Sequence, residues 1–195
     1  GRLDELLLER VMLQHGEQLS IIPAPIAATQ NFNLTGQSIE QLLGLIGSMA
    51  DYIILDLPHG TPDWQTTIFS KLDQVILMVY PDLANLRDAK KVFDQIDGHT
   101  NMGPSFNFVL NKVGLSASSE LPAKEFETVL NLKPIQSVPF DPKLFGKSLN
   151  NGAPIVATDK GSKASGSIIK IAQKLTGKEE QEKLSIFMPK FLKKK

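Results

Sequence analysis

Three short segments, each at the end of an apolar run, carry the side chains of this sequence best suited to chemistry. The first is DYIILDLPHG (51–60), in which Asp56 ends the run and Gly60 follows shortly after. A carboxylate at the carboxyl end of a strand can hold the water shell of Mg²⁺ or orient water, and a glycine lets backbone approach a phosphate. An aspartate there is also a frequent turn or helix cap, so this segment alone leaves both interpretations open.

The second segment is FNFVLNKVG (106–114), where Asn111 and Lys112 directly follow a predicted strand. An asparagine amide donates and accepts hydrogen bonds at once, which is what reading the edge of an adenine requires. An asparagine that closes a turn is the ordinary alternative.

The third segment is SVPFDPKLFGKSLNNGAPIV (137–156), in which a strand runs through Pro139, Phe140 and Asp141 into Pro142 and then a helix. The two prolines stiffen this loop, which could then form one wall of a pocket for a base. Proline-rich strand exits are also ordinary loops.

Apolar, β-branched runs alternate with segments of helical spacing along most of the chain. The predicted strands are 19–22, 52–56, 74–79, 105–110 and 135–138. This alternation predicts an α/β fold, a mostly parallel sheet flanked by helices on both faces. Near-continuous apolar sequence is typical of strands buried on both faces, so 52–56 and 74–79 are predicted to be central.

Apolar side chains at helical spacing predict five further elements as helices. They are marked by Leu3, Leu6 and Leu7; by Ile39, Leu42, Leu43 and Ile46; by Trp64, Ile68 and Leu72; by Leu86, Ala89, Phe93 and Ile96; and by Ile168, Ile171, Ala172 and Leu175. Pro81 and Asp82 are expected to open the fourth of these helices. Ser162 and Ser165 to Ser167 are expected in a loop or at a helix start, where N-capping accounts for them, and Gly177 is expected to end the last helix.

Composition excludes several classes of protein. The 195 residues include 21 basic and 21 acidic side chains, a formal net charge of zero, and no cysteine. Thiolate metal sites, disulfides and a cysteine nucleophile are therefore excluded, and a reducing, cytoplasmic setting is expected. His15, His59 and His99 have no metal-ligand spacing and are expected at the surface or in loops.

The order and spacing of the three segments resembles the deviant Walker A ATPases of the MinD and ParA type, from about residue 19 to residue 175. Within that superfamily, three stretches resemble the TadZ/CpaE pilus-assembly branch. They are PDLANLRDAKKVFD (81–94), GRLDELLLERVMLQHGEQLSIIPAP (1–25) and PDW (62–64). The resemblance implies the P-loop NTPase fold of the MinD/ParA type.

The resemblance also assigns a role to each candidate residue. Asp56 matches the Walker B carboxylate, which holds Mg²⁺ through water, and Gly60 matches a glycine beside the γ-phosphate. Asn111 matches the asparagine that reads adenine, with Lys112 beside it, and residues 139–141 match the loop that closes over base and ribose. ATP or ADP and Mg²⁺ are the cofactors that this implies.

The sequence departs from the family at the phosphate-binding loop, because it contains no GxxxxGK[ST] pattern. We therefore expect a C-terminal fragment that lacks the P-loop and the first strand. In this interpretation residues 1–176 are an incomplete nucleotide-binding domain and 177–195 a basic, partly apolar tail. The fragment alone is expected not to hydrolyse ATP, whereas the full-length protein is expected to be an ATPase.

The implied function is a nucleotide-dependent dimerisation switch that localises pilus assembly or secretion machinery, in the cytoplasm, at a cell pole or at the membrane. The expected partners are a second copy, bound through ATP, and proteins of that machinery. Arg87, in the LRDA stretch, is a candidate to face a partner or is simply solvated. The tail mixes apolar side chains with lysines, so it is expected either to contact an anionic membrane or to be a solvated end.

Two other functions fit the sequence. A non-catalytic polar scaffold would keep the fold and lose hydrolysis. A ParA-like DNA-partitioning ATPase would need a basic surface, and the zero net charge argues against one, so no nucleic-acid partner is expected.

Overall fold

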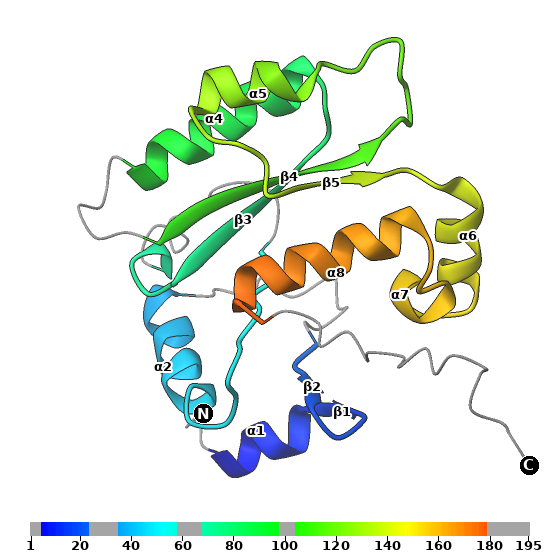
Figure 1. Cartoon of the computed structure of the whole chain (residues 1–195). Coiled ribbons are helices and arrows are strands. Elements are labelled where there is room, and N and C mark those ends of the chain that lie inside the picture. Colours follow the sequence, from blue (N-terminus) through cyan, green and yellow to red (C-terminus); the bar gives the residue numbers. More distant parts are fainter. Residues whose placement is uncertain (1–4, 24–34, 58–67, 98–103, 179–195) are drawn as a thin grey trace, which may run out of the picture. The chain divides into compact units, whose positions relative to one another are not determined.

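The computed structural model describes residues 5–23, 35–57, 68–97 and 104–178, which are coloured in Figure 1. The chain divides into two compact units. One unit comprises residues 1–75 and 96–105, and the other comprises residues 76–95 and 106–195.

The second unit is built on a parallel sheet of three strands in the order β3, β4, β5. The strands are β3 (Gln74–Val79), β4 (Ser105–Val113) and β5 (Gln136–Pro139). β4 pairs with β5 in parallel, with Val109 opposite Gln136. β4 is therefore the central strand of this sheet, and its residues Phe108 and Val109 are fully buried.

Helices cover both faces of the sheet (Figure 1). One face carries α4 (Leu83–Asp97) and α5 (Ala123–Leu130). The other carries α8 (Lys163–Thr176), preceded in the chain by α6 (Pro142–Asn150) and α7 (Ile155–Thr158). The predicted fold class, an α/β fold with a parallel sheet between helices, is confirmed.

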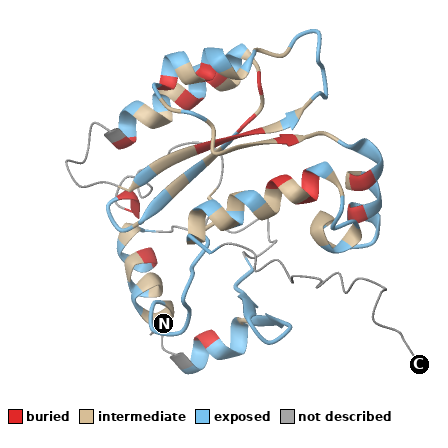
Figure 2. Ribbon diagram, viewed as in Figure 1, coloured by how far each residue is buried: buried red, intermediate tan, exposed pale blue. Residues whose placement is uncertain are grey.

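The alternation of side chains along β4 produces two cores. Phe108 and Leu110 pack with Phe126 of α5 and with the buried face of α4. Val109, which points to the opposite face of the strand, packs with Ala164 of α8 and with β5 and α6. Figure 2 shows buried residues in the central strand and in helices on both sides of it.

Among its described residues, the first unit includes the helices α1 and α2 and a small hairpin. These are α1 (Glu5–Val11), the antiparallel pair β1 (Leu13–His15) and β2 (Leu19–Ile21), and α2 (Gly36–Ile46). Gly16 has a φ of 70°, a left-handed conformation that glycine adopts without steric cost, in the turn of the hairpin. Thr35 caps α2, because its hydroxyl accepts a hydrogen bond from the Ser38 amide at 3.2 Å.

Most predicted helices are confirmed. α2 buries Ile39, and α4 buries Leu86, Ala89 and Ile96 as their spacing predicts. α8 ends at Gly177, whose φ of 65° gives the left-handed conformation common at helix ends. In α1, however, Leu8 is the buried leucine, whereas Leu6 is 60% exposed and Leu7 is 43% exposed, so the predicted face was wrong. Trp64 lies outside the described residues.

The prediction that 52–56 and 74–79 are the central strands is wrong. Residues 52–57 form neither a helix nor a strand, and Ile54 is 93% exposed. β3 is the outer strand of the described sheet, and its Met78 is 49% exposed. An apolar segment tends to be buried. Whether it is buried depends also on the strands beside it and the helices that cover it.

The remaining strands need smaller corrections. The predicted strand 19–22 is β2, which pairs with β1 in an exposed antiparallel hairpin instead of joining the parallel sheet. The strand predicted over 105–110 extends to Val113, and the one predicted over 135–138 is shifted by one residue. The sequence analysis did not anticipate α5, α7 or β1.

The start of α8 gives a first testable prediction. The Ser162 hydroxyl accepts a hydrogen bond from the Ser165 amide at 3.1 Å, as the sequence predicts for a capping serine. Ser162→Ala is therefore expected to lower the free energy of unfolding by about 1 kcal/mol, measured by urea denaturation. Ser118→Ala, at an exposed serine in the loop after β4, is the control and should change it by less than about 0.5 kcal/mol. Equal effects of the two changes would contradict the capping role.

Candidate functional site

The end of β4 is irregular where the sequence places Asn111 and Lys112. The pairing with β5 shifts register between Leu110 and Val113, so that β4 carries one extra residue there, as in a β-bulge. Lys112 has a φ of 57°, a left-handed conformation that costs a non-glycine residue about 1 kcal/mol. Bulges of this kind re-aim side chains and are frequent next to active sites.

The side chain of Asn111 is oriented by the backbone amide of the next residue, Lys112. Its Oδ1 accepts a hydrogen bond from the Lys112 amide at 2.9 Å, which turns the Nδ2 donors away from that amide. A carbonyl oxygen has two lone pairs, so Oδ1 can accept a second hydrogen bond from an exocyclic amino group while Nδ2 donates to a ring nitrogen. This is the pattern that adenine presents.

The loop after β5 lies beside this irregularity. The Phe140 amide donates to the Val113 carbonyl at 2.8 Å, so the ends of the two strands are joined directly. The Phe140 ring stacks on Phe145, with centroids 5.9 Å apart and an interplanar angle of 15°. The structure therefore brings Asn111 and Lys112 together with Pro139 and Phe140 at the carboxyl edge of the sheet.

Asp141 has a structural role at the same edge. Its carboxylate accepts a hydrogen bond from the Leu144 amide at 3.0 Å, which caps α6. Asp141 remains exposed, so its second carboxylate oxygen can face a ribose without losing the cap.

The candidates Asp56 and Gly60 fall in the residue range of the first unit. Asp56 is exposed in the segment 52–57, which is neither helix nor strand, and Gly60 lies outside the described residues. Within the described ranges, no three His, Asp or Glu side chains gather as a set of metal ligands. A carboxylate that holds Mg²⁺ only through water needs no such set, and an exposed Asp56 fits that chemistry.

Glu120 belongs to this edge of the sheet and was missed in the sequence analysis. Its carboxylate accepts hydrogen bonds from the Gly114 amide at 2.9 Å and from the Ser116 amide at 3.0 Å. The Tyr80 side chain lies near this carboxylate, and each of the two groups alters the pKa of the other. These residues close the loop that follows Lys112. The partners are backbone amides, so no motif of residue types could have indicated them.

The hydrogen bonds of this loop alter two pKa values. The Ser116 and Gly114 amides hold the pKa of Glu120 below its ordinary value of 4.5. Burial and the nearby Glu120 carboxylate raise the pKa of Tyr80 above its ordinary value of 10.0, so that Tyr80 keeps its proton. Because the folded-state pKa of Glu120 is depressed, its contribution to stability is present above the ordinary pKa and is lost as pH falls through the folded one.

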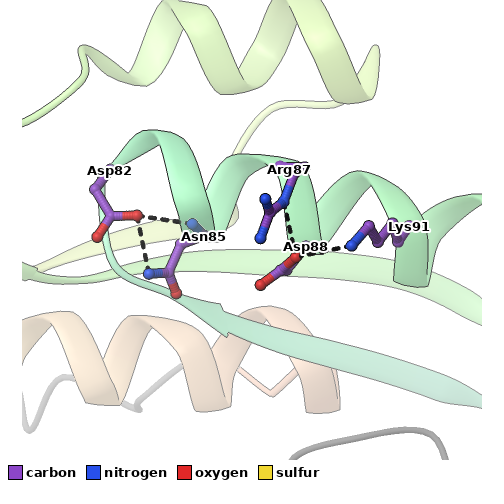
Figure 3. A network of polar contacts seen from close by, with 5 residues as sticks. All are labelled: Asp82, Asn85, Arg87, Asp88 and Lys91. Atoms are coloured by element: carbon purple, nitrogen blue, oxygen red, sulfur yellow. Dashed lines mark hydrogen bonds and ion pairs between the residues drawn. The ribbon is translucent and has the colours of Figure 1, made fainter.

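α4 carries two separate groups of polar contacts, one at its start and one around Asp88 (Figure 3). Asp82 caps the helix by accepting hydrogen bonds from Asn85, at 2.7 Å from the backbone amide and 3.0 Å from the side chain. Farther along, Arg87 and Lys91 lie 3.2 and 3.3 Å from the Asp88 carboxylate, and they lower the pKa of Asp88. The Arg87 side chain is 67% exposed, so this pair adds little stability and leaves the guanidinium at the surface.

Two curated proteins illustrate what the chain is similar to, and no protein-family model matches it. An uncharacterized ATP-binding protein of Methanocaldococcus jannaschii is 29% identical over 91% of this chain and 67% of its own length. A putative septum site-determining protein MinD of Emiliania huxleyi is 23% identical over 89% of the chain. The chain spans 64% of that relative's length.

Solved structures show the same fold. A ParA family ATPase from Chlorobium tepidum superposes with a TM-score of 0.78 at 22% identity, over 89% of this chain and 70% of its own. MinD of Pyrococcus horikoshii, solved with Mg-ADP, superposes with a TM-score of 0.73 at 21% identity, over 86% of this chain and 68% of its own. The fold is that of the MinD/ParA ATPases.

One of the similar structures is a MinD chain solved in a complex with MinC. The MinC:MinD complex of Aquifex aeolicus superposes with a TM-score of 0.60 at 24% identity, over 74% of this chain and 59% of the matched one. The chain is thus similar in sequence to an ATP-binding protein and to MinD proteins, and the Mg-ADP is that of the Pyrococcus horikoshii MinD. In the described ranges of this MinD/ParA fold, no helix is both long and apolar enough to cross a bilayer.

Proposed function

We propose that this chain is part of a MinD/ParA-type ATPase that acts as a nucleotide-dependent dimerisation switch and localises pilus assembly or secretion machinery. The observation that carries the nucleotide site is the joined carboxyl edge of β4 and β5. There the Phe140 amide bonds to the Val113 carbonyl, next to an asparagine whose amide is already oriented. In open α/β sheets, ligands bind at this edge.

Each candidate residue has a proposed part in holding ATP or ADP. Asn111 and Lys112 contact the adenine edge, and the 139–141 loop lies over base and ribose. Asp56 holds Mg²⁺ through water, and Gly60 lets the backbone approach the γ-phosphate. Bound Mg²⁺ supplies charge neutralisation for the phosphates.

The switch follows from differential affinity. ATP bound by two copies favours the dimer, and hydrolysis to ADP removes that preference. A protein of the pilus or secretion machinery that binds one state better than the other then follows the nucleotide. Arg87 on the exposed face of α4 and the 177–195 tail are the proposed contacts to such a partner and to an anionic membrane. The 179–195 part of that tail lies outside the described residues.

Calorimetry with ATP and Mg²⁺, combined with light scattering, tests the nucleotide site in the natural full-length protein. Asp56→Asn is expected to weaken Mg-ATP binding about tenfold, because a charged acceptor of the metal's water shell is lost. Asp51→Asn, at an exposed aspartate in the same segment, is the matched control and should bind as the unaltered protein does.

The outcomes separate the alternative functions. No ATP binding by the unaltered protein would leave the non-catalytic scaffold. ATP binding with salt-sensitive retention on DNA would favour a DNA-partitioning ATPase. Equal binding by Asp56→Asn and Asp51→Asn would remove Asp56 from the site and leave the remaining assignments standing.

Deleting the gene in its host tests the cellular role. Loss of surface pili with normal placement of the division septum is the expected result. Normal pili with misplaced septa would reject the pilus role and favour the role named for the MinD relatives.

A further inference from the structure

The loop that follows the proposed adenine site is held by a single carboxylate. Glu120 lies in the loop between β4 and α5. Its carboxylate accepts hydrogen bonds from the Gly114 and Ser116 amides. The Tyr80 side chain, directly after β3, lies near the same carboxylate, and each of the two groups alters the pKa of the other. We call Glu120, Gly114, Ser116 and Tyr80 the Glu120 clasp.

The backbone at this point needs such support. Lys112 and Gly114 both have positive φ, 57° and 90°, so the chain turns sharply directly after Asn111. The turn is closed by a hydrogen bond from the Leu115 amide to the Lys112 carbonyl at 3.1 Å. Left-handed backbone at a lysine persists only where surrounding contacts determine it.

The clasp also joins the ends of two neighbouring strands. The Leu121 amide, next to Glu120, donates to the Pro81 carbonyl at 2.7 Å, and Pro81 is fully buried after β3. The loop after β4 is therefore tied at one end to the exit of β3 and at the other to the turn at Lys112. Movement of Asn111 would have to break contacts on both sides.

We propose that Glu120 is a positioning residue that sets the preference of this site for adenine over guanine. The inference rests on the proposed nucleotide function. The Lys112 amide donates to Asn111 Oδ1 only while the turn holds that amide in place. The Glu120 clasp holds the turn in its conformation, and the turn holds the Lys112 amide in position. That amide then determines where Asn111 Oδ1, the hydrogen-bond acceptor, points.

The orientation of the amide decides the base because adenine and guanine present opposite groups at one position. Adenine has an amino donor on C6, and guanine has a carbonyl acceptor there. With Oδ1 held toward the Lys112 amide, Asn111 matches the adenine pattern. Once that constraint is lost, the side chain can rotate by half a turn about its last bond, and its Nδ2 can then donate to the guanine carbonyl.

The experiment compares ATP and GTP affinities of the natural full-length protein by calorimetry. Glu120→Ala is expected to reduce the ATP-to-GTP affinity ratio about fivefold, the effect of one net hydrogen bond. Glu120→Gln keeps one acceptor oxygen and should recover part of that ratio. Tyr80→Phe removes only the hydroxyl and should lower the ratio less. Glu125→Gln, at an exposed glutamate in α5, is the matched control and should leave it unchanged.

Hydrogen exchange separates a lost clasp from a lost fold. In Glu120→Ala the Gly114 and Ser116 amides should exchange faster, whereas the Phe108 and Val109 amides of β4 should keep their protection. An unchanged ATP-to-GTP ratio together with faster exchange at Gly114 and Ser116 would overturn the positioning role alone. No ATP binding by the unaltered protein would overturn the proposed function and this inference together.

Discussion

Phe126→Ala is expected to lower the free energy of unfolding by about 3–5 kcal/mol, the largest stability effect of any single change considered for this chain. Phe126 is fully buried in α5 and stacks on Phe108 of the central strand, with ring centroids 6.3 Å apart. Truncation removes this contact and leaves a cavity between helix and sheet. Urea denaturation followed by circular dichroism measures the effect.

Val129→Ala in the same helix is the control for that measurement. Val129 is 39% exposed, so its truncation loses little burial and should change the free energy of unfolding by less than about 1 kcal/mol. Total stability of a domain is only about 5–15 kcal/mol, so the Phe126 variant should be close to unfolding. A decrease in the free energy of unfolding below about 1.5 kcal/mol for Phe126→Ala would show that the core between α5 and the sheet contributes little to stability.

The helix that contains Phe126 also shows where sequence reasoning was limited. α5 follows a proline and buries only Phe126 and Leu130 fully, so its apolar repeat is too short to stand out from a loop. α8 has a longer repeat, a capping serine and a terminal glycine, and these local signals predicted both of its ends. Because such local signals themselves stabilise the helix, they can be recognised from the sequence of that segment alone.

Strand positions were predicted better than strand environments. The run over 105–110 has Phe106, Phe108 and Leu110 on one face and Ser105, Asn107 and Val109 on the other, and β4 buries Phe108 and Leu110 on one face and Val109 on the other. The run 52–56 has similar composition, yet Ile54 is 93% exposed. Composition cannot distinguish these cases, because burial of a strand depends on residues far away in the sequence that cover it.

The candidate site divides in the same way. The rule that ligands bind at strand ends located Asn111 and the 139–141 loop, which adjoin through the bond from the Phe140 amide to the Val113 carbonyl. The register shift and the positive φ of Lys112 could not be predicted, because pairing between β4 and β5 determines them. Glu120 could not be identified from the sequence, because its partners are backbone amides, which are present at almost every residue.

Asn111→Ala is expected to weaken ATP binding by the natural full-length protein between about fivefold and 150-fold, the range for losing one paired contact to a base edge. Because the Asn111 side chain is partly exposed and, among the described residues, accepts a hydrogen bond from the neighbouring Lys112 amide, the free energy of unfolding should fall by less than about 1 kcal/mol. Affinity for GTP should change far less, since the lost groups match adenine. Calorimetry with both nucleotides and a urea denaturation curve measure these quantities.

The comparison with Asn107→Ala makes the expected result specific to the site. Asn107 lies on the same strand, four residues before Asn111 and toward the amino end of β4, so its loss should not affect nucleotide binding. Equal ATP affinity in both variants would show that Asn111 does not contact the base. No residue at the joined strand ends would then be assigned to base recognition. A parallel loss of ATP and GTP affinity in Asn111→Ala would mean that the asparagine supports the turn at Lys112 and does not read the base. ATP affinity that falls alone would instead connect the irregular end of β4 to base recognition, because only an oriented amide distinguishes the two purines.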